Sequence, residues 1–348
     1  MVVKRLQQYS RMTSMAMGNF YHSVITAYPN CITKINSEND YFVGVKQTSV
    51  VSEPFISFLE QNGFHLHTVD KASHKGRGID IDLKNPITGN VMTGSSSGTA
   101  INVFLGINDI GIGTDGGGSV LSPASALNLI GFIHPKIGEG QIDFKSYVKK
   151  STDNISFTPS IGFISREIDL IKKIFSLFID EEFYDKELTI VVDDEIDENK
   201  WKHWEKYKNI EPVNLEYKYQ YSREDLVLSL ENLFSDADLV ISKEGPIDVY
   251  GIGETIFGHF DEHSKEIQIQ GKKGFVRVVN MCNAIGLIVP STELSTGYLI
   301  IGRINSKVER AMFEIAELLI AKEDLLLKNY FLDHSSFFEG GYLSLIHI

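Results

Sequence analysis

GSSSG at residues 94–98 is followed by GTDGGGS at residues 113–119, and these two segments decide how the chain is interpreted. Glycine adopts backbone angles closed to other residues and lets a ligand approach the main chain. Successive N–H groups in such a turn can point into one concavity and bind an anion. The hydroxyl of Ser119 would stand beside these donors, an arrangement that suits a nucleophile next to an oxyanion hole.

Other uses of a glycine-rich turn compete with this interpretation. Most such turns only make a tight connection, so the second segment alone is weak evidence. Gly111, Gly113 and Gly116 fit G-x-G-x-x-G, but Pro123 comes too early for the long helix of a dinucleotide site. No lysine follows the glycines as a P-loop requires, and Ser119 does not stand in a G-x-S-x-G elbow.

A nucleophilic serine needs a proton acceptor, and histidine is the usual one. The nearest histidines, His74 and His134, stand in no recognisable catalytic context. A lysine can act instead where burial and neighbours keep it neutral. Lys46 ends the apolar run 41–45, which predicts a buried strand and makes this lysine the candidate base. The competing interpretation is an ordinary lysine at a strand end that reaches solvent.

These segments resemble the amidase signature family. Its members carry GGSSGG and then GTDxGGS at the separation seen here, where Ser95 and Ser119 lie 24 residues apart. The similarity covers about residues 40–325 and includes YFVGVKQ at 41–47. It implies an α/β amidase-signature fold, with a central mixed β-sheet covered by helices on both faces. Predicted strands that alternate with predicted helices favour the same fold class.

The resemblance also implies a Ser–Ser–Lys triad that works through a seryl acyl-enzyme intermediate. The lysine of the family falls on Lys46, its bridging serine on Ser95 and its nucleophile on Ser119. Family members hold the bridging serine by a cis peptide bond, so we expect one between Gly94 and Ser95. The implied activity is that of an amidase, a hydrolase of carbon–nitrogen bonds other than peptide bonds, without a cofactor.

The same resemblance assigns the residues that surround the nucleophile. The donors of the oxyanion hole are four consecutive backbone N–H groups, those of Gly116, Gly117, Gly118 and Ser119. Two further residues match neighbours that support the loop, Ser96 and Asp115. Neither H-E-x-x-H nor a paired C-x-x-C occurs in the sequence, which therefore indicates no metal site.

Seven positions depart from the family pattern, and the chain is shorter than members of the family. The seven are Thr93, Ser97, Leu121, Asn128, Ile133, Asn283 and Ile285. None of them removes a member of the triad, so they predict a divergent amidase with an altered substrate pocket. Two alternatives remain open: an amidase-like binding protein without turnover, and a subunit of a glutamine-dependent amidotransferase.

Hydrophobic periodicity predicts how the chain is organised. We expect a single amidase-like domain over residues 1–348, with a signature core at about 40–170 and a part that completes the sheet at about 186–327. One or two helices are expected within 1–30 and a closing helix over 306–327. Residues 75–99 have loop composition. Helical spacing over 163–178 places Ile164 on the apolar face of a helix.

Composition limits the partners. The formal net charge of −13 opposes binding to nucleic acid or anionic lipid and favours neutral or cationic substrates. We therefore expect a small-molecule or peptide-like amide as substrate, no nucleic acid and no membrane, with a homodimer as one option. The acidic runs Asp180–Glu182 and Asp193–Glu198 are predicted to be solvated surface. Only two cysteines and no signal peptide predict a cytoplasmic protein.

Overall fold

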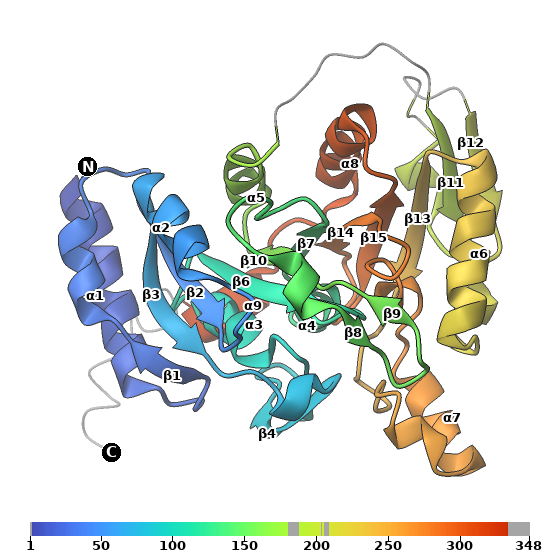
Figure 1. The fold of residues 1–348 in the computed structure, drawn as a ribbon, viewed down its shortest axis with the longest axis horizontal. Coiled ribbons are helices and arrows are strands. Elements are labelled where there is room, and N and C mark those ends of the chain that lie inside the picture. Colours follow the sequence, from blue (N-terminus) through green and yellow to red (C-terminus); the bar gives the residue numbers. More distant parts are fainter. Residues whose placement is uncertain (1, 180–187, 203, 205–208, 333–348) are drawn as a thin grey trace.

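The fold is built around one large mixed sheet (Figure 1). The computed structural model describes residues 2–179, 188–202, 204 and 209–332. The strands lie in the order β1 (Val24–Ala27), β3 (Phe64–Asp70), β2 (Tyr41–Lys46), β6 (Ile110–Asp115), β10 (Ser160–Ser165), β7 (Ile130–His134), β14 (Ile285–Pro290), β15 (Gly297–Gly302), β13 (Leu239–Glu244), β11 (Thr189–Asp193) and β12 (Asn209–Val213). Strand β2 pairs in parallel with β3 and β6, and β11 with β12 and β13, whereas the other neighbours are antiparallel.

Two small sheets flank the large one. They consist of β4 (Ile79–Lys84) with β5 (Val91–Thr93), and of β8 (Lys149–Lys150) with β9 (Ser156–Phe157). The 3-10 turns are η1 (Pro29–Lys34), η2 (His74–Gly76), η3 (Phe144–Tyr147), η4 (Glu198–Lys200), η5 (Glu216–Tyr219), η6 (Phe257–His259) and η7 (Phe275–Arg277), and a π-helical turn spans Lys328–Leu332.

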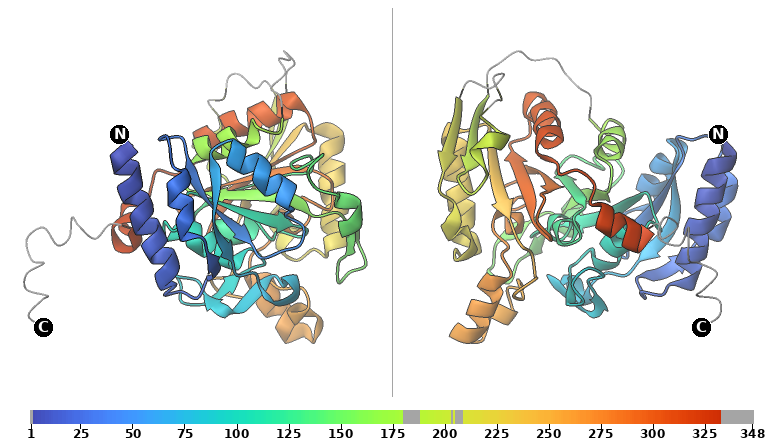
Figure 2. Two further views of the ribbon diagram at one scale, coloured as in Figure 1. Left: turned by 60° about the vertical axis from the view of Figure 1, so that its left-hand side comes forward. Right: turned by 180° about the vertical axis from the view of Figure 1, so that it is seen from behind.

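Helices cover both faces of the sheet (Figure 2), which confirms the predicted fold class. One face packs against α2 (Glu53–Gln61), α5 (Ile168–Phe175) and α8 (Ser306–Leu319). The opposite face packs against α3 (Ser97–Phe104), α4 (Leu121–Ala126) and α6 (Arg223–Asp236). Alternation along the strands supplies both cores, since Leu287 belongs to the first and its neighbour Ile288 to the second. The remaining helices are α1 (Val2–Gly18), α7 (Glu262–Gln270) and α9 (Leu325–Leu327).

Local chemistry explains where several helices begin and end. The hydroxyl of Ser52 caps α2 by accepting the N–H of Phe55, and Pro54 occupies the first turn, where its missing N–H costs nothing. Gly63 then takes a φ of 83° just beyond the helix. Ser222 caps α6 in the same way through the N–H of Asp225. The cap at Ser222 therefore makes Arg223 the first residue of α6.

Four expectations about local structure were wrong in part. Residues 163–178 are not one helix, because Ile164 lies in the buried strand β10 and the helix begins at Ile168. A short apolar run is compatible with the period of a helix and with that of a strand. Here pairing with β6 and β7 stabilises the strand. Residues 75–99 include β4 and β5 rather than loop alone. Residues 1–30 form one helix followed by β1, and the closing helix breaks after Leu319.

The acidic run that begins at Asp193 is only partly solvated. The side chain of Asp193 is fully buried, whereas Asp194, Glu195, Asp197 and Glu198 are exposed as expected. Burial of this carboxylate is balanced by an ion pair with Lys218, which a local pattern could not indicate. The other acidic run, Asp180–Glu182, lies outside the described residues.

Within the described residues, no helix combines the length and the apolar character that a bilayer crossing requires.

Candidate active site

Parallel pairing brings the candidate base to the glycine loop. Strands β2 and β6 lie side by side in parallel, with Val45 opposite Ile112. Because both strands end at the same edge of the sheet, Lys46 at the end of β2 meets Thr114 near the end of β6. The Gly94–Ser95 peptide bond is cis, as predicted, and Ser95 lies at the same edge.

Lys46 is buried, so the expectation of an inward-pointing lysine is confirmed. Its Nζ lies 2.6 Å from Ser95 Oγ, 3.1 Å from Thr114 Oγ1 and 3.2 Å from the carbonyl oxygen of Thr114. A neutral amine has two N–H donors and one lone pair. It can therefore donate to both oxygens of Thr114 and accept the hydroxyl proton of Ser95, which satisfies all three contacts.

The electrostatic surroundings favour this neutral form. Burial lowers the pKa of Lys46 to about 7, because the charged ammonium loses its hydration. Asp115 opposes that change by attracting the ammonium, and the nearby Lys149 reinforces it by repulsion. At neutral pH a substantial share of Lys46 is therefore uncharged, as a general base must be.

Asp115 shapes the loop that carries Ser119. Its buried carboxylate accepts the N–H groups of Gly118 at 2.7 Å, Val120 at 2.6 Å and Leu121 at 3.3 Å. Burial raises its pKa, and these donors act in the opposite direction. Gly118 has a φ of 92°, and a Cβ there would come within 2.8 Å of the carbonyl oxygen of Val276. Glycine is therefore required at this turn.

Not every predicted oxyanion donor is available. The N–H groups of Gly116, Gly117 and Ser119 belong to residues that line a cavity. The N–H of Gly118 instead donates to Asp115, so the assignment of Gly118 to the oxyanion hole is wrong in this conformation. The other residue predicted to support the loop, Ser96, joins the two segments, because its N–H donates to the carbonyl oxygen of Ser119 at 3.1 Å.

The cavity has a volume of about 630 Å³ and contains Lys46, Ser95 and Ser119 in its lining. Ser119 is half-buried and thus reachable from it. Residues distant in the sequence complete the walls, among them the hairpin of β8 and β9 (Figure 1) and side chains of 254–256. Arg223 and Met281 also line it. Sequence reasoning missed these two residues, since no motif marks them and only the packing of α6 and of the segment that follows η7 brings them to the loop.

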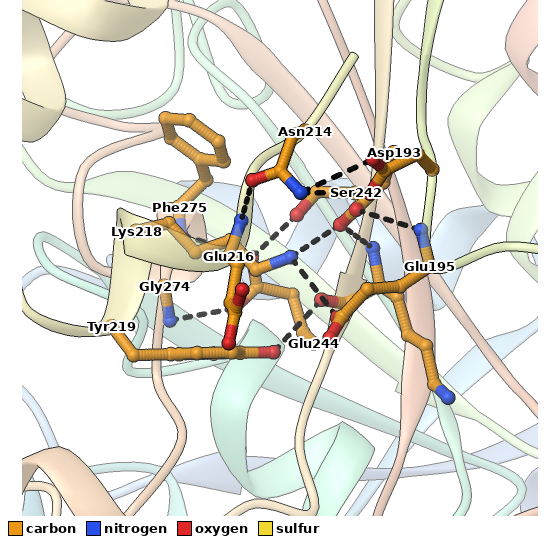
Figure 3. A network of polar contacts seen from close by, with 12 residues as sticks. Asp193, Glu195, Asn214, Glu216, Lys218, Tyr219, Ser242, Glu244, Gly274 and Phe275 are labelled. Atoms are coloured by element: carbon orange, nitrogen blue, oxygen red, sulfur yellow. Dashed lines mark hydrogen bonds and ion pairs between the residues drawn. The ribbon is translucent and has the colours of Figure 1, made fainter. Parts of the chain in front are cut away.

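A buried polar network supports the back of the site (Figure 3). Glu244 accepts the N–H groups of Gly274 at 2.7 Å and Phe275 at 2.9 Å, and burial raises its pKa. Lys218 stands between this carboxylate and Asp193, with which it pairs. The network thereby fixes the start of η7, and the next residue along the chain, Val276, abuts Gly118.

Several departures from the family pattern have structural partners of their own. The hydroxyl of Thr93 donates to Asp248 at 2.6 Å, and that of Ser97 donates to Asp80 at 2.6 Å. Leu121 is buried in the core. Asn128 and Asn283 take positive φ angles of 52° and 50°. Ile133 and Ile285 fill the buried strands β7 and β14. Each of these residues therefore has a defined structural place in this chain, as a hydrogen-bond donor, a core side chain or a residue with a positive φ.

Comparison with known proteins finds similarity to amidases and related enzymes. A model of the family described as Amidase matches residues 82–249. An amidase of known structure superposes with a TM-score of 0.56 at 13% identity, over 91% of this chain and 98% of the other. The glutamyl-tRNA(Gln) amidotransferase chain of known structure from Thermotoga maritima gives 0.59 at 15%, over 91% and 93%. Allophanate hydrolase from Kluyveromyces lactis gives 0.61 at 15%, over 96% and 71%.

At these identities the structural matches demonstrate a shared fold. No curated protein matches the sequence significantly. The family model spans both glycine–serine segments, which are the segments that build the cavity around Ser119. The chain therefore matches the Amidase family over residues 82–249 and shares the fold of amidases of known structure, at low sequence identity.

Proposed function

We propose that this protein hydrolyses an amide bond through a Ser–Ser–Lys triad, with Ser119 as nucleophile, Ser95 as proton relay and Lys46 as base. One observation carries the proposal: a buried amine with a lowered pKa lies 2.6 Å from a serine hydroxyl, in a cavity that also contains Ser119 and the glycine loop. The match to the Amidase family model over residues 82–249 supports the same reaction.

The reaction would begin when Lys46 takes the proton of Ser95 and Ser95 takes that of Ser119. The Ser119 oxygen attacks the amide carbonyl, and the N–H groups of Gly116, Gly117 and Ser119 stabilise the oxyanion that forms. The relay then returns a proton to the nitrogen of the leaving amine, because an amide anion is too basic to depart unprotonated. Water attacks the acyl-enzyme next, and the same base accepts its proton and restores Ser119.

Labelling with a fluorophosphonate tests the nucleophile directly. We expect the purified protein to react covalently, and we expect Ser119→Ala to abolish the reaction. Ser235→Ala is the matched control, because Ser235 is an exposed serine of α6 outside the cavity. If the folded parent protein stays unlabelled, the amidase-like binding protein is the better interpretation. If ammonia is released from glutamine only with a second protein present, the amidotransferase alternative replaces this proposal.

The pH profile tests the base. The value of kcat/KM for a neutral amide should rise with pH and level off above an apparent pKa of about 7, since only the uncharged amine of Lys46 accepts a proton. Lys149→Gln should move the midpoint to higher pH, because it removes a positive charge that disfavours the ammonium. A profile that stays flat from about pH 6 to about pH 9 would contradict Lys46 as the base, because no amine would then titrate in that range.

A further inference from the structure

The cavity carries a charge opposite to that of the whole chain. The protein has a formal net charge of −13, yet five lysine or arginine side chains besides Lys46 line this cavity, against one carboxylate of the described residues, Glu254. The five are Lys75, Arg77, Lys149, Lys150 and Arg223. Charges of one sign gathered in a concave site focus the potential there. The preference for neutral or cationic substrates expected from net charge therefore does not hold at the site itself.

The five cations occupy two kinds of position. Lys75, Arg77, Lys149 and Lys150 are exposed at the mouth, where they attract an anion over a distance but hold it weakly. Arg223 is only 15% exposed and lies beside the glycine loop. A Cβ placed on Gly117 would be 3.7 Å from Arg223 Nη2. Of the five, Arg223 is thus the one that lies against Gly117 in the glycine loop.

One edge of the Arg223 guanidinium has no hydrogen-bond partner among the described residues. Nη1 donates to Asp153 at 3.0 Å and to Thr152 at 3.3 Å. Nε is buried and has no hydrogen-bond partner among the described residues, and none of their acceptors receives a hydrogen bond from Nη2. Nε and Nη2 together form the side of the guanidinium that matches the two oxygens of a carboxylate. Because a buried donor without a partner is costly, this edge is suited to a substrate group.

We propose that the substrate is an amide that also carries a carboxylate, and that Arg223 binds this carboxylate through Nε and Nη2 while the amide carbonyl lies at Gly116, Gly117 and Ser119. The inference deepens the proposed function and rests on it. The distance from Gly117 to Arg223 places the carboxylate a few bonds from the amide carbon, so the molecule is short. The exposed lysines would accelerate its capture and make that capture sensitive to salt.

Binding without turnover provides the test. Calorimetry with the Ser119→Ala protein would compare succinamate, glutaramate and adipamate with their methyl esters, which differ by the single negative charge. We expect at least one carboxylate to bind about tenfold or more tightly than its ester, equivalent to about 1.4 kcal/mol. Arg223→Gln in the same background should remove the difference in affinity between acid and ester. Arg223→Lys should keep only part of that difference, because lysine retains the positive charge but lacks the paired N–H donors of the guanidinium.

Lys84→Gln is the matched control, since Lys84 is an exposed cation at the end of β4 outside the cavity, and it should leave the preference intact. The inference is overturned if all three esters bind as tightly as the acids, or if Arg223→Gln keeps the preference. Failure of the proposed function looks different. In that case the carboxylates bind with Arg223-dependent affinity, while Ser119 is not labelled and the parent protein releases no ammonia from them.

Discussion

Lys46→Ala is expected to lower kcat/KM for amide hydrolysis by roughly 10²–10⁴-fold, the range contributed by a general base. The amine of Lys46 is the buried group placed to accept the proton of Ser95, at 2.6 Å. Ser95→Ala should retain more activity, because a water molecule in the space of the lost hydroxyl can connect Lys46 to Ser119. The measurement is steady-state hydrolysis of one amide by the three proteins.

Two controls separate chemistry from folding in this series. Lys136→Ala changes an exposed lysine that does not line the cavity, and it should match the parent. Thermal unfolding of Lys46→Ala should show a cooperative transition, so that lost activity reports on the base. Full activity in a folded Lys46→Ala protein would contradict the assignment of Lys46 as the base, since no other buried amine among the described residues lines this cavity.

Lys218→Ala should lower the free energy of unfolding by about 3–5 kcal/mol, the usual cost of leaving a buried charge without its partner. Lys218 and Asp193 are 1% and 0% exposed, and they pair directly (Figure 3). The substitution leaves the Asp193 carboxylate without its cation in the core. It also removes the positive charge that stabilises Glu244, whose pKa is already raised by burial. Urea denaturation would measure the loss.

Lys34→Ala is the comparison for this experiment, because the side chains of its ion pair with Glu60 are 46% and 30% exposed, far more than those of Lys218 and Asp193. We expect it to cost no more than about 1 kcal/mol. Combining Lys218→Met with Asp193→Asn should recover part of the stability, since no charge is then left unpaired at that position. Equal effects of Lys218→Ala and Lys34→Ala would show that the buried network does not hold the fold as described.

Local sequence patterns were informative where one segment determines its own structure. The apolar run before Lys46 predicted β2, because short buried strands need continuous apolar side chains. The pattern failed over residues 163–178, where an apolar run has both a strand period and a helical period.

Charges were predicted less well than strands, for a physical reason. Whether Asp193 is exposed depends on Lys218, which lies on a different element and pairs with it only in the folded chain. The bulk charge of the sequence likewise gave the wrong sign for the cavity, because the lining side chains come from segments spread over about 230 residues. Only their assembly determines the local field.

The sequence by itself determined the residue types at the site, namely a lysine after a buried strand, two serines and a glycine turn, because each is written in a continuous stretch of chain. The tertiary structure decided which donors stay free. It directs the N–H of Gly118 to Asp115 and leaves one edge of Arg223 unpaired beside Gly117. Hydrogen bonds between distant segments compete for the same donors, and the outcome of that competition depends on distances that exist only after folding.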